Sequence, residues 1–426
     1  MLIRQATLLD GAVVDIRVGD TIEQVAASLP PHPGEYVLDA ASGTVIPGLH
    51  DHHLHVYSAA AEMDSIRVGP AEVSDEAGLG RALTAAPAGS DGWVRAVGYH
   101  EAVAGPLDRQ LLDRWVPDVP VRVQHRSGAL WTVNSPGLAA LGLGGHPDGI
   151  LRSADETWSA ALERRRPAAV AEFSARLAGY GVTGVTDATP DLAPADRPTG
   201  LRQRVHCLAP GKRILHDDGL DLDGLTEWIA DRHRGDAPVA VHCVTAAQLV
   251  VTIAALRAAG RHPADRIEHA AMVPADSVGD LVGLGVTVVT QPNFVAERGD
   301  QYRTDVPAAE QEQLWRLGSL LAAGVPVALS TDAPFGSADP WAAMRAAVHR
   351  RTPDGAVLNP AERITGRRAL TLFLGSAENP TCARRIAPGQ PGDLCVLTAS
   401  PQRVVEELDA DLVAATVVGG AVVFQR

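Results

Sequence analysis

Short apolar strands alternate with amphipathic helices along the second half of this 426-residue chain. The stretch "APVAVHCV" predicts a buried strand. The following "TAAQLVVTIAALRAAG" predicts a helix, because its apolar residues recur at three- and four-residue spacing and Gly260 closes it. Further strands are predicted over "DRIEHA", "VTVVTQ" and "VPVALSTD". Regular strand–helix alternation is typical of a parallel sheet, and at this length it favours an α/β fold with a (β/α)8 barrel.

The segments between and after these strands predict helices over "VPADSVGDLVGLG", "PAAEQEQLWRLGSLLAAG" and "DPWAAMRAAVHRR". The first has a proline near its first turn, and the last has Asp339 as N-cap with Pro340 behind it. Both patterns are usual signals for the start of a helix.

The two ends of the chain have a different sequence pattern, in which short runs of β-branched residues are separated by turns. Examples are "AVVDIRVG" and "LVAATVVGGAVVFQR". Neither end is long enough to bury a core alone. We therefore predict one small β-sandwich domain built from residues 1–46 and 388–426. The barrel would occupy residues 47–387 between them.

The front half of the barrel contains too many candidate strands. Strand-like runs occur at 94–99, 120–125, 182–187, 204–208 and 212–216, besides "TVIPG" and the four later strands. Parallel neighbours need a crossover of about a dozen residues, which is missing between 208 and 212. We therefore expect 94–125 to form an inserted hairpin region over the barrel mouth, within an insertion around 90–160.

Composition restricts the class of partner. Hydrophobic residues make up 46% of the chain, and the formal net charge is −14. An acidic protein is a poor candidate for nucleic acid or an anionic membrane surface. We interpret the basic run at 164–166 as a solvated helix face instead of a phosphate site. A small-molecule substrate is expected, with association into a homodimer left open.

Cysteine usage and hydropathy indicate a cytoplasmic protein. The four cysteines are scattered without paired metal spacing, as expected for reduced thiols. The N-terminal "MLIRQATLLDG" has no long apolar region and no cleavage signature. No apolar stretch approaches the roughly 18 residues of a membrane span.

The most unusual stretch is "PGLHDHHLH" at residues 47–55. Successive side chains of a strand point to opposite faces, so one face carries Asp51, His53 and His55, and the other carries His50, His52 and Leu54. A His-x-His pair at the end of a buried strand can place two imidazoles on one metal ion. For His50 and His52 we favour ordinary satisfied or exposed side chains.

Three residues downstream strengthen the metal interpretation. His242 ends "VAVH", His269 ends "DRIEH" and Asp332 ends "VALSTD". Barrel enzymes keep their active residues at the carboxyl ends of the strands. Imidazole and carboxylate are ligands that suit zinc and similar divalent ions.

The order Asp-x-His-x-His, followed by His, His and Asp on later strands, resembles the amidohydrolase superfamily. Further stretches are similar to its branch of metal-dependent amidases that includes N-substituted formamide deformylases. They are "GTVIPGLHDHHLH", "HRSGALWTVNS", "GVTGVTDA", "VAVHCVT", "RIEHAAMVP", "VVTQPNF", "STDAPFGSADPW" and "IAPGQPGDLCVL". The similarity covers nearly the whole chain. It implies the barrel fold and hydrolysis of a C–N bond.

The resemblance also implies roles for individual residues. His53 and His55 match the metal ligands of the first strand, and His242 and His269 match those of strands five and six. Asp332 matches the aspartate that contacts metal and moves a proton. Lys212 is the candidate for a carbamylated lysine that bridges two metals. The alternative is a solvated lysine at a turn, a single metal, and His269 serving the substrate or water.

Candidate substrate contacts are less specific. Tyr99, His100, His125, Arg126 and Asn134 lie in the segment that resembles the family's substrate-facing region, and Asp187 and Gln291 lie at strand ends. Each is equally well interpreted as a capping residue or as support for another side chain.

The predicted reaction is hydrolysis of an N-substituted amide or formamide by water activated at a divalent metal, most simply zinc, with one or two ions. A deaminase acting on an aminated heterocycle is the first alternative, because its chemistry at metal and aspartate is nearly identical. A non-catalytic barrel scaffold is a second alternative, although the complete ligand set argues against it. A lyase or isomerase that uses the metal only as a Lewis acid is the third.

Overall fold

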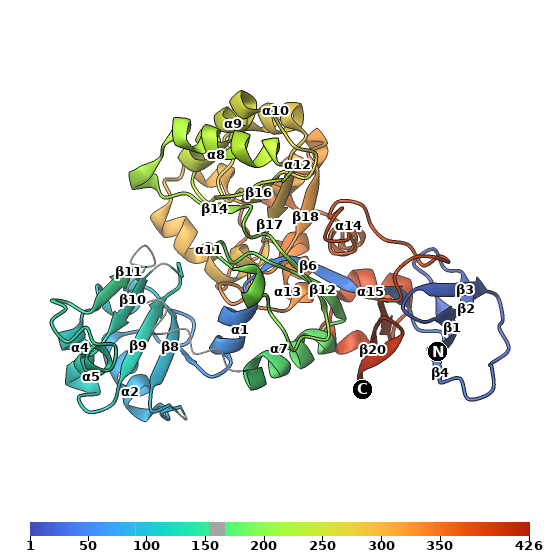
Figure 1. Ribbon diagram of the computed structural model, residues 1–426, viewed down its shortest axis with the longest axis horizontal. Coiled ribbons are helices and arrows are strands. Elements are labelled where there is room, and N and C mark those ends of the chain that lie inside the picture. The colour runs from blue at the N-terminus through green and yellow to red at the C-terminus, as the bar shows by residue number, and fades with distance from the viewer. Residues whose placement is uncertain (90, 129, 153–166) are drawn as a thin grey trace. The chain divides into compact units, whose positions relative to one another are not determined.

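The computed structural model describes residues 1–89, 91–128, 130–152 and 167–426 and has an α/β fold (Figure 1). It divides into two compact units, Met1–Val56 with Ser174–Arg426, and Tyr57–Phe173. The arginine run at 164–166 lies outside the described residues. Among the described residues, no helix has both the length and the apolar character needed to cross a membrane.

Parallel strands form the centre of the first unit. One sheet has the order β13-β12-β6 and the other the order β14-β15-β16-β17-β18. The strands are β6 (Leu49–Leu54), β12 (Val182–Asp187), β13 (Arg204–Cys207), β14 (Lys212–Ile214), β15 (Ala240–Cys243), β16 (Arg266–His269), β17 (Thr287–Thr290) and β18 (Val327–Leu329). Beyond β18, Asp332 N donates to His53 O at 2.9 Å and His55 N donates to Ala333 O at 2.8 Å. The two sheets are therefore joined where β18 passes β6.

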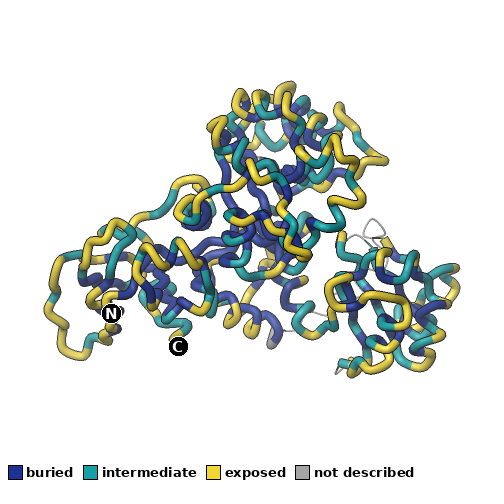
Figure 2. Tube along the Cα trace, turned by 180° about the vertical axis from the view of Figure 1, so that it is seen from behind, coloured by how far each residue is buried: buried dark blue, intermediate teal, exposed yellow. Residues whose placement is uncertain are grey.

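Helices pack around these strands, and Figure 1 shows α8, α9, α10 and α12 gathered on one side of β14, β16, β17 and β18. The helices are α7 (Pro167–Gly179), α8 (Leu222–Arg234), α9 (Ala246–Ala259), α10 (Ala275–Leu284), α11 (Asn293–Asp305), α12 (Leu317–Ala323), α13 (Pro340–His349), α14 (Gly366–Thr371) and α15 (Pro401–Glu407). Figure 2 shows the strands at the centre as buried and the outer turns of the helices as exposed.

The predicted start signals are confirmed for two helices, and Asp339 accepts the Trp341 N–H at the start of α13. Pro274 is the N-cap residue of α10. Helix α9 begins with a capping box between Thr245 and Gln248, which was not predicted.

The predicted helix over residues 307–324 is wrong in its first half. The chain forms a short 3-10 turn at Gln311–Gln313, and α12 begins only at Leu317. Trp315 has φ +50°, a left-handed conformation that interrupts a right-handed helix. The preceding helix α11, at Asn293–Asp305, was not predicted. It ends just before Val306, which precedes a proline and so disfavours helix.

The structure also explains why the sequence contains more strand-like runs than the barrel needs. "TVIPG" contributes β5 (Val45–Pro47), which pairs with a C-terminal strand, and the parallel set starts at Leu49. The runs at 204–208 and 212–216 both belong to the parallel set. They need no long crossover, because β13 and β14 lie in different sheets and residues 208–211 form a tight turn closed by Gly211 N donating to Leu208 O at 2.7 Å.

Residues from both termini share one hydrophobic core in the first unit. One sheet has the order β3-β2-β1-β4 and the other β21-β20-β19-β5. These strands are β1 (Leu2–Thr7), β2 (Val13–Val18), β3 (Ile22–Ala26), β4 (Val37–Asp39), β19 (Leu394–Leu397), β20 (Val413–Val418) and β21 (Ala421–Gln425). Ile3, Ile16 and Val18 pack in the same cluster as Leu394 and Val417. We refer to these two sheets as the terminal β-region.

The second unit, Tyr57–Phe173, is wider than the predicted insertion at 90–160. Its sheet has the order β11-β10-β9-β8-β7. Its strands are β7 (Ile66–Arg67), β8 (Val94–Tyr99), β9 (Val121–His125), β10 (Leu130–Val133) and β11 (Ile150–Arg152), and its helices include α2 (Glu76–Ala85), α3 (Glu101–Ala104), α4 (Arg109–Trp115) and α5 (Ser135–Ala140). Helix α1 (Val56–Glu62) leads into it from β6.

The predicted hairpin over 94–125 is wrong. Strands β8 and β9 are parallel, with Tyr99 opposite His125. The chain between them contains α3 and α4, which supply the crossover that a parallel pair requires. The antiparallel pairs in this sheet are β9 with β10 and β10 with β11.

Candidate metal centre

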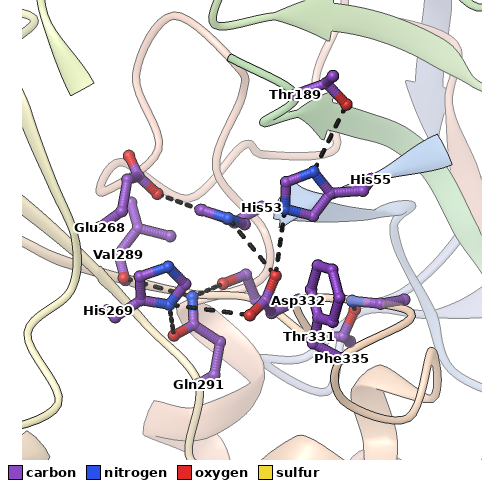
Figure 3. Close-up of polar contacts among 12 residues, drawn as sticks. His53, His55, Thr189, Glu268, His269, Val289, Gln291, Thr331, Asp332 and Phe335 are labelled. Carbon is purple, nitrogen blue, oxygen red and sulfur yellow. Dashed lines mark hydrogen bonds and ion pairs between the residues drawn. The ribbon is translucent and has the colours of Figure 1, made fainter. Parts of the chain in front are cut away.

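Three predicted ligands converge at the ends of β6 and β18 (Figure 3). His53, His55 and Asp332 each offer a ligand atom, and these atoms lie within 4.8 Å of one another. His53 Nε2 and His55 Nε2 are each 3.5 Å from Asp332 Oδ1. The alternation predicted for β6 therefore places His53 and His55 on one group, as expected from their spacing.

Asp51 positions this group through the backbone. Its side chain is fully buried, and it accepts the Thr331 hydroxyl at 2.5 Å, the Thr331 N–H at 3.1 Å and the His53 N–H at 3.2 Å. Burial raises the pKa of Asp51 to about 7, against the effect of these hydrogen bonds. The carboxylate therefore ties β6 to the residue that precedes Asp332.

Two candidate ligands have unusual backbone conformations. His269 has φ +69° and Asp332 has φ +57°. A non-glycine residue in the left-handed region costs about 1–3 kcal/mol and is found most often at functional sites. His269 is the last residue of β16, and the side chain of the preceding Glu268 is fully buried.

The other two predicted histidine ligands lie beside this group. His269 Nδ1 is 3.9 Å from Asp332 Oδ2, and the His269 ring centroid lies 4.7 Å from that of His53. The His242 ring centroid is 4.4 Å from that of His269. The five predicted ligands thus form a continuous cluster, with His53, His55 and Asp332 the most closely grouped.

Burial shifts the pKa values of the histidines in this cluster in the direction that suits a bound cation. It lowers the pKa of His242 to about 3, and it lowers the pKa values of His53 and His269 well below the ordinary value. These rings are therefore neutral and keep a lone pair for a metal. His53 Nε2 and Asp332 Oδ1 are buried and have no hydrogen-bond partner in the described structure. An uncompensated buried acceptor is costly, and a divalent cation would satisfy both atoms.

Lys212 lies on β14 and is 5% exposed. Its ammonium nitrogen is buried and has no hydrogen-bond partner in the described structure. Burial lowers the pKa of Lys212 to about 8, although the charges of Glu268 and Asp332 oppose this. On the parallel ladder it stands opposite Ala240, two residues before His242. It is therefore an interior lysine, and the alternative of a solvated lysine at a turn is wrong.

Sequence reasoning missed Glu268, which is fully buried between two partners. Its Oε2 is 2.5 Å from His53 Nδ1, and Arg266 Nε donates to its Oε1 at 2.7 Å. The available signal was a glutamate inside "RIEH", a strand predicted to be buried, because an ionised side chain is rarely buried without a partner.

Two of the predicted substrate contacts hold other parts of the site. Gln291 is fully buried, and its Oε1 lies 2.8 Å from His269 Nδ1 while its Nε2 donates to Ser330 Oγ at 2.8 Å. Asp187 is also buried and accepts the N–H groups of Val56 and Thr189 at 2.9 Å each. In the structure, Gln291 supports an imidazole and Asp187 caps the backbone.

The remaining predicted substrate contacts belong to the second unit. Tyr99 is buried and its hydroxyl donates to Gly105 O, which makes it part of the core there. Asn134 is buried as well and caps α5 by accepting the Gly137 N–H at 3.0 Å. Arg126 lies in the turn after β9 and is partly buried.

His100, Glu101 and His125 form a second group with ligand atoms within 4.8 Å of one another. His125 Nε2 is 3.1 Å from Glu101 Oε2. His100 Nδ1 accepts the Ala102 N–H, and His125 Nδ1 accepts the Ser127 N–H, each at 3.1 Å. A neutral ring whose Nδ1 accepts carries its proton on Nε2, so this group favours hydrogen bonding over metal binding.

His50 and His52 lie outside both groups. Their rings stack with centroids 4.6 Å apart, and His50 Nε2 is 2.9 Å from Thr186 Oγ1. Both residues are buried, so the expected alternative of exposed side chains is wrong. The alternative of a satisfied ring holds for His50 but not for His52, whose two ring nitrogens have no hydrogen-bond partner in the described structure.

Comparisons with known proteins identify the family of this chain. The model of the amidohydrolase family matches residues 36–206 and 196–424. The N-substituted formamide deformylase of Arthrobacter pascens is 25% identical over 93% of this chain and 90% of its own length. Two solved metal-dependent hydrolases of uncharacterised function have similar folds. That of Pyrococcus furiosus has a TM-score of 0.70 at 19% identity over 94% of this chain and 99% of its own. That of Pyrococcus horikoshii OT3 has a TM-score of 0.71 at 18% identity, covering 95% and 98%.

The family model thus covers most of the chain, including the segments that carry His53, His55, His242, His269 and Asp332. The chain belongs to the amidohydrolase family and is an enzyme that hydrolyses carbon–nitrogen bonds other than peptide bonds.

Proposed function

We propose that this enzyme cleaves an N-substituted amide or formamide with water activated at a divalent metal, most simply zinc. The observation that carries the proposal is the convergence of His53, His55 and Asp332, with unpartnered atoms on His53 and Asp332. Neutral imidazole nitrogen and carboxylate oxygen are the donors that zinc prefers. His242 and His269 would complete the ligand set.

Lys212 supports a second ion at the same site. Carbamylation would convert its buried amine into a carboxylate-like group that can bridge two ions, and its nitrogen is buried without a hydrogen-bond partner. A two-metal site is therefore our proposal for the loaded enzyme. We also propose that the eight parallel strands form a (β/α)8 barrel, which the bonds between β6 and the residues beyond β18 support.

A bound divalent ion would lower the pKa of water at this site and polarise the carbonyl group under attack. Asp332 then has a direct role in moving protons. Its carboxylate takes a proton from the attacking water as the new C–O bond forms, and it delivers that proton to the amine nitrogen as the C–N bond breaks. The left-handed backbone at Asp332 and the tie from Asp51 to Thr331 hold the carboxylate in place for both transfers.

The likeness to an N-substituted formamide deformylase supports a formamide or another small N-acyl amine as substrate. The rival is a deaminase that releases ammonia from an aminated heterocycle. Both reactions need the same ligands and the same proton transfer, so the leaving group distinguishes them.

The test is a panel of N-substituted formamides, N-acetyl amines and aminated heterocycles, incubated with the metal-loaded enzyme. The proposal predicts release of a primary amine with formate or acetate. Asp332→Ala should abolish the release and serves as the matched control. Release of ammonia from the heterocycles, with no cleavage of any amide, would establish the deaminase instead.

A further inference from the structure

We propose that Glu268 is a positioning residue of the metal centre: it accepts the Nδ1–H of His53 and thereby directs the Nε2 lone pair of that ring toward Asp332. The inference rests on the proposed function, because it concerns how one ligand of that centre is held. Glu268 itself is not a ligand in this account.

The geometry of the His53 ring carries the inference (Figure 3). Nδ1 lies 2.5 Å from Glu268 Oε2, and the two side chains are 1% and 0% exposed. On the opposite side of the ring, Nε2 is 3.5 Å from Asp332 Oδ1 and has no hydrogen-bond partner in the described structure. A neutral imidazole carries a single N–H, and an ionised carboxylate can only accept. The proton therefore belongs on Nδ1, and the lone pair is left on Nε2.

Arg266 fixes Glu268 in this orientation. Its Nε donates to Oε1 at 2.7 Å and its Nη2 donates to Oε2 at 3.1 Å. The same Nη2 donates to the backbone oxygen of His52 at 2.6 Å. One guanidinium thus holds both the carboxylate and the segment of β6 that carries His53. A carboxylate on the far nitrogen of a metal-binding histidine fixes the tautomer and raises the basicity of the ligand.

A purely structural interpretation makes Glu268 only the counter-ion of Arg266. The contact with His53 is then incidental, and every substitution that removes the negative charge has the same effect on metal affinity. The two interpretations differ in what they predict for the position of the His53 proton and for a neutral replacement that still accepts a hydrogen bond.

The first test reads the tautomer of His53 in the metal-free wild-type protein. Long-range ¹H–¹⁵N spectra of protein labelled at the histidine ring nitrogens distinguish protonated from unprotonated nitrogen, and His53→Gln assigns the signal. The inference predicts a proton on Nδ1 and none on Nε2. A proton on Nε2 would overturn it.

The second test compares Glu268→Gln with Glu268→Leu by competition of zinc against a chelator. Both variants remove the charge that faces Arg266, but only glutamine keeps an oxygen that can accept from Nδ1. Glu268→Leu should weaken zinc affinity by roughly 10–100-fold, the usual cost of losing such a partner, and Glu268→Gln should weaken it clearly less. Cobalt-loaded Glu268→Leu should also show an altered visible spectrum, because the ring is no longer held.

A buried acid elsewhere in the first unit provides a matched control. Glu362 is 4% exposed, and its Oε1 lies 3.7 Å from Arg316 Nε. Its carboxylate also accepts the Ser319 N–H at 2.7 Å. Glu362→Gln should lower the melting temperature and leave zinc affinity unchanged.

Unchanged affinity in Glu268→Leu, or equal losses in the leucine and glutamine variants, would overturn the inference. If Glu268→Leu does not fold, the tautomer of His53 in the wild-type protein decides the matter alone. A wild-type protein that binds no divalent ion would contradict the proposed function instead, so the two failures are distinguishable.

Discussion

At the scale of single residues, the chemistry of the site follows from burial. His53 is surrounded by protein, and burial lowers its pKa well below the ordinary value. A neutral ring with an unpaired Nε2, facing an unpaired carboxylate oxygen of Asp332, is an arrangement that a cation would stabilise. The left-handed backbone conformation of Asp332 also costs free energy, and the surrounding structure keeps the residue in that conformation.

Asp332→Asn tests the proton transfer assigned to this residue. Asparagine keeps the size and one oxygen, but it loses the negative charge and the ability to accept a proton. We expect kcat to fall by roughly 10²–10⁴-fold, the usual contribution of a general acid–base group. KM should change much less, because the lost interaction belongs to the transition state. Steady-state kinetics of the metal-loaded variant are the measurement, and a near-normal kcat would remove Asp332 from the mechanism.

The sequence was sufficient to predict the candidate ligands but not the residues that hold these ligands in position. The five candidates lie close to the carboxyl ends of β6, β15, β16 and β18, and such ends meet at one edge of a parallel sheet. They are His53, His55, His242, His269 and Asp332. The partners of these residues lie far apart in sequence, so no local spacing reveals them. Glu268 and His53 are separated by 215 positions in the sequence, and Asp51 and Thr331 by 280.

At the scale of elements, the terminal β-region contains an ion pair that makes its stability depend on pH. Arg17 Nε donates to Glu35 Oε1 at 2.9 Å, and these side chains are 7% and 9% exposed. The Arg17 hydrogen bond, together with the His32 N–H, lowers the pKa of Glu35 from its ordinary value of 4.5 to about 2. A carboxyl with a lowered pKa binds fewer protons in the folded state, so stability rises with pH through this window.

The variant Glu35→Gln should therefore be less stable than wild type at neutral pH. The difference should shrink as the pH falls from about 4.5, and it should vanish below about 2, where both side chains are neutral. Urea unfolding of both proteins at a series of pH values measures this. A difference that stays constant across the window would mean that the ionised Glu35 does not stabilise the fold.

Helices and strands with strong end signals were predictable, and those without them were not. Asp339 and Pro340 marked the start of α13, and Gly260 marked the end of α9. The segment of α11 has few apolar residues at regular spacing, so its periodicity was weak. The parallel pairing of β8 and β9 depends on contacts across the second unit, which spacing alone does not reveal.

At the scale of the whole molecule, the two ends of the chain depend on each other. Strand β19 pairs with β5, and Val396 and Val417 pack in the same core as Ile3 and Ile16. Burial of such apolar side chains is the main favourable term in folding.

Deleting residues 390–426 should therefore yield insoluble protein. The deletion removes β19, β20 and β21, and it leaves the apolar faces of β1, β2 and β5 uncovered. Removing only residues 425–426 is the control and should leave the protein soluble, because these residues are exposed. Soluble and fully active protein after the long deletion would contradict a terminal domain built from both ends.

Elemental analysis of three purified proteins, wild type, His53→Ala and His52→Ala, shows whether His53 holds a catalytic metal ion. We expect a stoichiometric divalent metal in the wild type and in His52→Ala, since the His52 ring stacks on His50 outside the metal-binding group. His53→Ala should be nearly free of metal. A wild type without metal, or loss of metal from His52→Ala but not from His53→Ala, would mean that His53 is not a metal ligand.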